Sequence, residues 1–144
     1  MARNIVRGTS RRAVALVEFA VVVILMLWLV LGVIEFGWMI LKSQQITNAA
    51  RQGARIGARV DAQNADVTAA IAAVMTAAGM PDYDDPILEP ADIEALGGGE
   101  HFSVTVRASY ANIGLGVFPV AWLPLPDKLG AQVTMAKEGY NLPP

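Results

Sequence analysis

The sequence predicts an α+β protein in which a long N-terminal helix, apolar enough to cross a membrane, continues into a small head. Three observations support this class. The run Phe19–Leu41 contains a single charged residue, Glu35, and no proline follows it before Pro81. Two runs of alternating apolar and polar residues then lie near the C-terminus, which is typical of half-buried strands. The head is therefore expected to combine helices with a small antiparallel sheet.

The apolar run has the length of a transmembrane helix. At about 1.5 Å per residue, Phe19–Leu41 measures roughly 34 Å, enough to cross a hydrocarbon core of ~30 Å. A cleaved secretory signal has a shorter apolar core of about 7–15 residues. All charged residues before Glu18 are arginines, so the positive-inside rule places the N-terminus in the cytoplasm and residues 42–144 outside it.

Composition limits what the head can be. The chain has 144 residues, which leaves room for one modest domain beside the helix. It has no cysteine, so disulfides and thiolate metal sites are excluded. Residues 1–60 carry a net charge of +6 and residues 61–144 a net charge of −8. Such a split is typical of a membrane anchor, a nucleic-acid arm or an acidic tail, and the apolar run favours the membrane.

Small residues recur beyond the predicted membrane segment. Ala49, Gly53 and Gly57 are spaced by four, which lets two helix backbones approach closely. A glycine within a solvated helix costs about 1 kcal/mol relative to alanine, so close packing is one reason to tolerate two. The alternative is an alanine-rich amphipathic helix that rests on its own domain.

The rest of the head shows one more helix and three strands. A helix is expected over 65–78, capped by Asn64 or Asp66 and ended by Gly79 and Pro81. Strands are expected over 102–110 and 129–135, with a poorer one over 87–93. The expected core of this sheet consists of Phe102, Val104, Val106, Val133 and Met135.

The start of the apolar run carries a processing motif. Ala13–Phe19 reads AVALVEF and resembles a prepilin-peptidase site: a small residue, four apolar residues, then Glu-Phe. The resemblance implies cleavage between Ala13 and Val14, which makes Val14 the new N-terminus. It also implies that Glu18 pairs with the freed amine of a neighbouring subunit. The chain then divides into a basic leader (1–13), a transmembrane helix (14–41) and an extracytoplasmic head (42–144).

Two further motifs extend the resemblance. GVIEFG over residues 32–37 and QQITNAARQGAR over residues 44–55 are similar to the TadE-like proteins, minor pseudopilins of the tight-adherence (Flp) type IV pilus. The resemblance implies a pilin-like fold in the inner membrane and a role in assembling or priming a pilus used in adhesion or secretion. It implies the membrane, a prepilin peptidase, other pilin subunits and the pilus platform as partners.

Elementary electrostatics favours the pairing of Glu18. After cleavage, a carboxylate and an amine lie in a setting of low dielectric, where an unpaired charge is expensive. A neighbour's opposite charge relieves that cost if subunits are staggered by a few residues. The alternative is that Glu18 is only a boundary residue at the cytoplasmic surface of the membrane.

The remaining candidates favour no catalysis. Glu35 is expected at the outer membrane interface, solvated, with a subunit contact as the alternative. The acid-rich run Pro81–Glu100 lacks a calcium-loop pattern and is expected to be solvated surface. His101 is the only histidine and assembles no catalytic set. We therefore expect no enzyme, no metal, no cofactor, no nucleic acid and no small-molecule substrate.

An apolar, proline-rich segment joins the two clear strands. It either folds over the core or exposes a patch for a partner through Phe118, Trp122 and Leu123. The sequence as a whole favours a processed minor pseudopilin. The alternative is an uncleaved single-pass membrane scaffold of a secretion or envelope complex.

Overall fold

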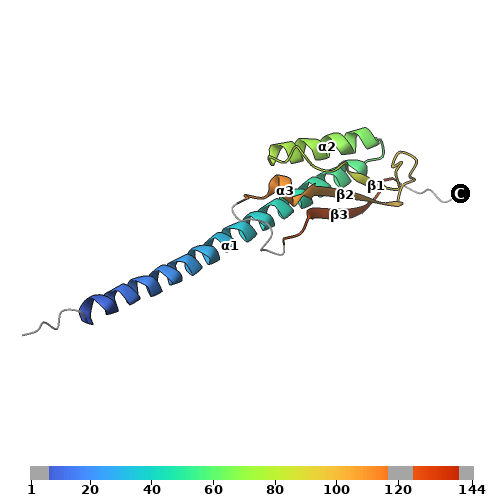
Figure 1. Ribbon diagram of the computed structural model, residues 1–144. Helices are drawn as coiled ribbons and strands as arrows, with labels where there is room; N and C mark the ends of the chain where they lie inside the picture. The colour runs from blue at the N-terminus through green and yellow to red at the C-terminus, as the bar shows by residue number, and fades with distance from the viewer. Residues whose placement is uncertain (1–6, 117–124, 140–144) are drawn as a thin grey trace, which may run out of the picture.

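The computed structural model describes residues 7–116 and 125–139, and the side chains from Arg12 onward within the first range. A single long helix projects from a small head, and its N-terminal part extends free of the head (Figure 1). The elements, in chain order, are α1 (Arg7–Gly57), α2 (Asn64–Ala77), β1 (Ile87–Glu89), β2 (His101–Ser109), α3 (Tyr110–Ile113) and β3 (Lys128–Ala136). The predicted α+β class is confirmed.

Helix α1 is continuous through the predicted membrane surface. Its 51 residues correspond to about 77 Å at 1.5 Å per residue. No proline interrupts this stretch, so no backbone hydrogen bond is lost. One helix therefore serves both as the exposed apolar stalk and as the spine of the head.

Helix α2 begins one residue before the predicted start. Gln63 precedes it, and its backbone N–H donates to Asp66 Oδ2 at 3.2 Å, so Asp66 satisfies one of the free donors at the helix start. Asn64, a predicted cap, binds the loop before β2 instead: its Nδ2 donates to Ala91 O at 2.6 Å, and Ile93 N donates to its Oδ1 at 3.2 Å. Gly79 follows the helix with φ +69°, a conformation that favours glycine.

The three strands form one antiparallel sheet in the order β1-β2-β3. Val104 of β2 pairs with Leu88 of β1 on one side and Val133 of β3 on the other. β1 is three residues long and ends before Pro90, so the predicted strand over 87–93 was too long. Tyr110, which was predicted to end the second strand, instead begins α3.

The core lies between the sheet and the two long helices. Phe102, Val104 and Val106 are fully buried, as predicted, whereas Val133 and Met135 are only half-buried beside the core. Ser103 and Thr105, on the predicted polar face of β2, are buried as well, at 7% and 9% exposure. β2 is the central strand, so neighbours on β1 and β3 flank these side chains on both sides.

Candidate functional site: the long helix and its junction with the head

The residues of the processing motif lie in the free part of α1. Ala13, Val14, Glu18 and Phe19 are helical and exposed. Glu18 makes no ion pair or hydrogen bond within residues 12–116 and 125–139, the part whose side chains are described. Its carboxylate is therefore free to meet a group from another chain. The predicted cleavage and the predicted Val14–Glu18 pairing between subunits stay predictions.

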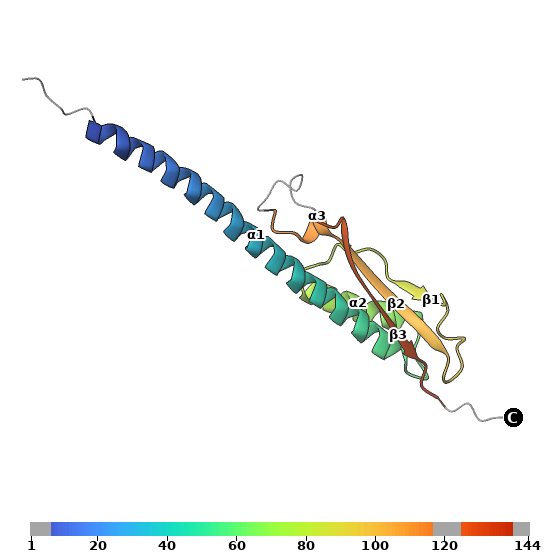
Figure 2. The same ribbon diagram turned by 90° about the horizontal axis from the view of Figure 1, so that it is seen from below.

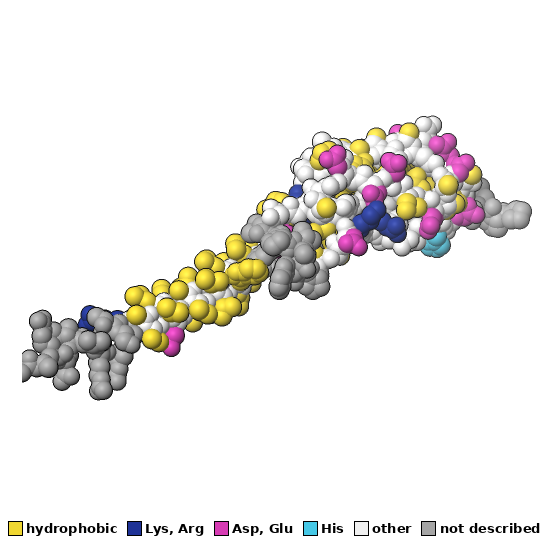
Figure 3. Space-filling model, viewed as in Figure 1, with side chains coloured by type: hydrophobic (Ala, Val, Ile, Leu, Met, Phe, Trp, Pro, Cys, Tyr) yellow, Lys and Arg dark blue, Asp and Glu magenta, His cyan; other side chains and the backbone are white. Residues whose placement is uncertain are grey.

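The part of α1 that precedes Glu35 is exposed and mostly apolar, and we call it the apolar rod. Its most apolar window of 18 residues has a mean hydropathy of 2.9 and contains no buried residue. Figure 3 shows apolar side chains along this rod, in contrast with the mixed surface of the head. By length and composition this helix could span a membrane. Leaving so many large apolar side chains in water would be unfavourable, at about 25 cal/mol per Å² of apolar surface.

Glu35 is the first residue along α1 that the head buries. It is 2% exposed, and Tyr110 Oη donates a hydrogen bond of 2.5 Å to its Oε1. The expectation that Glu35 is solvated at the membrane interface was wrong, because Tyr110, at the start of α3, covers it. Its second oxygen, Oε2, is buried and has no hydrogen-bond partner among the described residues. Burying a carboxylate oxygen without a hydrogen bond costs free energy. The hydrogen bond from Tyr110 to the other oxygen is therefore important for stabilising Glu35 in its buried position.

Two further side chains of α1 complete this contact. Trp38 Nε1 donates to Ile113 O at 2.7 Å, which ties the end of α3 to α1. Lys42 is 6% exposed, and its Nζ donates to Ala78 O at 2.8 Å. That carbonyl lies at the C-terminal end of α2, where the helix dipole favours a cation. We call Glu35, Trp38 and Lys42, with the three groups they bind, the junction.

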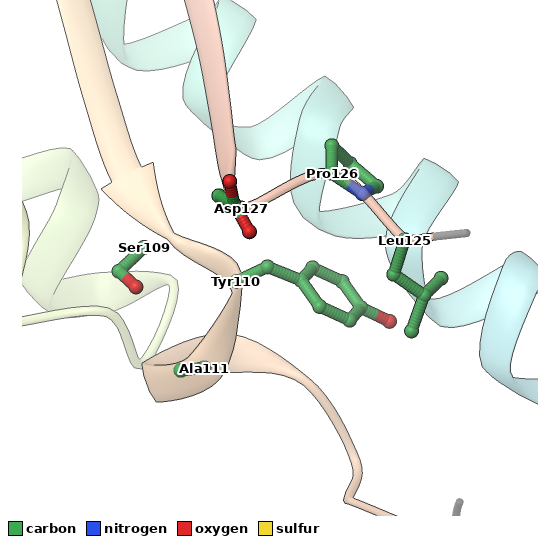
Figure 4. A pocket seen from close by; sticks show the side chains of 6 residues that line it. All are labelled: Ser109, Tyr110, Ala111, Leu125, Pro126 and Asp127. Carbon is green, nitrogen blue, oxygen red and sulfur yellow. The ribbon is translucent and has the colours of Figure 1, made fainter. Parts of the chain in front are cut away.

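The environment of Tyr110 keeps its hydroxyl protonated. Burial, followed by the hydrogen bond to Glu35 and the charge of Glu35, raises the pKa of Tyr110 to about 12. Figure 4 shows its ring pointing from the start of α3 toward Leu125, in a small pocket also lined by Ser109, Ala111, Pro126 and Asp127. Tyr110 N also donates to Asp127 O at 2.9 Å. The tyrosine is thus fixed through both its backbone and its hydroxyl.

The small residues of α1 face the chain's own head. A Cβ added to Gly53 would lie 2.7 Å from Ile71 Cδ1, and one added to Gly57 would lie 2.9 Å from Phe102 Cε2. Ala49 is fully buried. Close approach of α2 and β2 to α1 thus accounts for these positions within one chain, which is the second of the two alternatives that the sequence left open.

A second buried lysine joins two loops at the end of the head that lies away from the junction. Lys137, after β3, is 4% exposed, and its Nζ donates to Ile93 O at 2.8 Å and to Ala62 O at 3.5 Å. The lysine binds the loop that follows α1 and the loop that precedes β2. No sequence pattern pointed to this role.

The other candidates lie apart from one another. His101 is exposed at the start of β2, far along the strand from Tyr110. The acidic side chains of 81–100 are exposed except Asp84, which is half-buried and pairs with Lys128 at 2.8 Å. Within the described residues, no group of three or more His, Cys, Asp or Glu is placed to hold a metal ion. Phe118, Trp122 and Leu123 lie outside the described residues.

One comparison with known proteins gives a match. The model of the family described as TadE-like protein matches residues 1–55. No curated protein and no solved structure matches the chain. The matched part comprises the apolar rod, the junction residues of α1, and two of the three small residues that face the head, Ala49 and Gly53. The N-terminal part of the chain is thus TadE-like, which suggests a protein associated with a Tad pilus and carrying an N-terminal helix that could span a membrane.

Proposed function

We propose that this chain is a membrane-anchored minor pseudopilin that assembles or primes a Tad-type pilus after cleavage by a prepilin peptidase. The observation that carries the proposal is the division of α1. Its first part is an exposed apolar rod, and its last part is the buried spine of an α+β head. A subunit that moves from a membrane into a fibre needs both parts on one helix. The TadE-like match over residues 1–55 supports the same role.

The proposed role is structural rather than enzymatic. The junction uses polar groups to fix the head on the helix. The proposed partners are the membrane, the peptidase, other pilin or pseudopilin subunits and the inner-membrane platform. The four arginines before Val14 favour an N-terminus in the cytoplasm and a head outside it.

Deletion and complementation in the cell of origin test this role. Deleting the gene should remove or reduce surface pili, and the full chain should restore them. The chain should stay in the membrane after alkaline carbonate extraction, and protease added to spheroplasts should digest the head. Normal piliation in the deletion strain would contradict the proposal, and a head protected from protease would reverse the topology.

A further inference from the structure

One face of α1 stays open where the helix enters the head. Gln44, Asn48, Arg51 and Arg55 are exposed on it, and we call these four residues the α1 outer face. With Thr47, the first three line a groove of about 310 Å³. The face continues one side of the apolar rod, so a neighbour that lies beside the rod also meets this face.

The two arginines of the α1 outer face carry uncompensated charge. Within residues 12–116 and 125–139, the ion pairs are Arg59–Asp61 and Lys128–Asp84. Arg51 and Arg55 therefore have no acidic partner in that part of the chain. The two arginines also lie one helical turn apart. Two like charges at this spacing are mildly unfavourable in an isolated helix, and an acidic partner would remove that cost.

The opposite flank of the head carries the complementary charge. Asp82, Asp85 and Glu89 are exposed on or just before β1, and no basic residue occurs between 81 and 100. We call these three residues the β1 edge. Figure 3 shows acidic side chains spread over one face of the head with few basic ones among them.

The α1 outer face and the β1 edge point away from each other. Among the described strands, β1 lies at the edge of the sheet and pairs with β2, whereas α1 packs on β2 and β3. Figure 2 shows α1 and β1 on opposite flanks of the head. One chain cannot bring the two surfaces together, but two parallel copies can.

The two surfaces also lie at matching heights along α1. Glu89 pairs with Ser103 of β2, and the adjacent Phe102 ring lies against Gly57. Glu89 is therefore level with the last turns of α1, which contain Arg55. Asp85 lies closer to the junction than Glu89, on the same side as Arg51 relative to Arg55, because β1 and β2 are antiparallel. Copies anchored in one membrane by the same helix stand at similar heights, and the stagger of four residues that pairs Glu18 with Val14 shifts them by only about 6 Å. The long arginine side chains can therefore still reach the acidic residues of the neighbouring copy.

We propose that Arg51 and Arg55 of one copy dock on Asp85 and Glu89 at the β1 edge of a second copy. The contact is head-to-tail, since each copy offers a different surface, and such contacts build rings or open rows rather than two-fold symmetric dimers. It rests on the proposed function, in which subunits assemble side by side. The complementary charges set the register between copies.

Cysteine cross-linking in membranes tests the contact, because the chain has no cysteine of its own. One full-length copy carries Arg55→Cys, and a second, with a different tag, carries Glu89→Cys. Mild oxidation should join the two differently tagged copies, with much weaker joining of like copies. Adding Arg51→Glu to the first copy should reduce the cross-link, and adding Asp85→Arg to the second as well should restore it. Arg107→Glu in the first copy is the matched control and should change nothing. Arg107 of β2 is exposed and has no ion pair among the described residues, and it borders the β1 edge of the first copy, which this cross-link does not use.

Three results would overturn the docking: equal joining of like and unlike copies, a cross-link that survives Arg51→Glu, or trapping of another membrane protein alone. Processing and piliation are scored on the same cells. A chain that is processed and supports pili without this cross-link refutes only the docking. A chain that is neither processed nor needed for pili refutes the proposed function, whatever the cross-link shows.

Discussion

Tyr110 and Glu35 lie 75 residues apart in the chain and are joined by a buried hydrogen bond of 2.5 Å. The bond fixes the head to α1 at the point where the apolar rod ends. Tyr110→Phe should lower the free energy of unfolding by about 1–3 kcal/mol, because it leaves a buried carboxylate without its donor. Chemical denaturation of the full chain in detergent measures this. Tyr83→Phe is the control: Tyr83 is half-buried and its hydroxyl makes no hydrogen bond among the described residues. Equal losses in both variants would contradict the role of the bond.

The same bond predicts a loss of stability at high pH. The folded chain raises the pKa of Tyr110 from 10.0 to about 12, so the protonated hydroxyl is favoured in the folded state. This stabilisation is complete below pH 10 and is lost as the pH rises from about 10 to 12. Since one pKa unit corresponds to about 1.4 kcal/mol, the loss should reach roughly 2–3 kcal/mol. Subtracting the pH profile of Tyr110→Phe from that of the parent chain isolates it, and superimposable profiles would rule it out.

Gly57 should resist enlargement. A Cβ at this position would lie 2.9 Å from the buried Phe102 ring, so Gly57→Ala should destabilise the chain by about 1–3 kcal/mol through overpacking. Gly37→Ala is the control, since nothing lies within 4 Å of its added Cβ. Thermal unfolding of both variants compares them. A Gly57→Ala chain as stable as Gly37→Ala would show that the contact with β2 is loose.

The two lysines at the ends of β3 should differ in their effect. Lys137→Met leaves Ile93 O and Ala62 O without their buried donor, at a cost of about 1–3 kcal/mol. Lys128→Met removes only an exposed pair with Asp84, worth about 0–1 kcal/mol. Denaturant midpoints of the two variants measure the difference. A larger loss of stability in Lys128→Met than in Lys137→Met would contradict the stabilising role of the buried lysine.

The sequence could predict the elements but not the contacts that join them. The period of apolar residues located α2, β2 and β3, because it reflects which side of each element faces the core. An uninterrupted apolar run located the first part of α1, whereas β1 was predicted too long. The junction joins Glu35 to Tyr110 and Trp38 to Ile113, each pair 75 residues apart, and no local pattern encodes such a distance. One signal was present: an ionisable residue in an apolar helix calls for a partner. Lys42 and Lys137 gave no such signal, since a lysine outside an apolar run is usually solvated.

Glu18 should matter for assembly and not for insertion or folding. It is exposed and far from the head on α1, so Glu18→Ala and Glu18→Gln should insert and fold normally. Glu18→Gln keeps the shape and removes the charge, which separates electrostatics from packing. Both variants should be cleaved and yet fail to support pili, as measured by membrane level, processing and piliation. Normal piliation by both would make Glu18 a boundary residue only.

The N-terminal residue of the protein recovered from membranes of a pilus-producing cell tests the account most directly. Intact-mass measurement with N-terminal peptide sequencing reads it without any mutation. We expect a chain that begins at Val14, and a chain that retains residues 1–13 in a strain lacking the prepilin peptidase. Recovery of only uncleaved chain from the peptidase-containing cell would contradict processing and favour a single-pass scaffold.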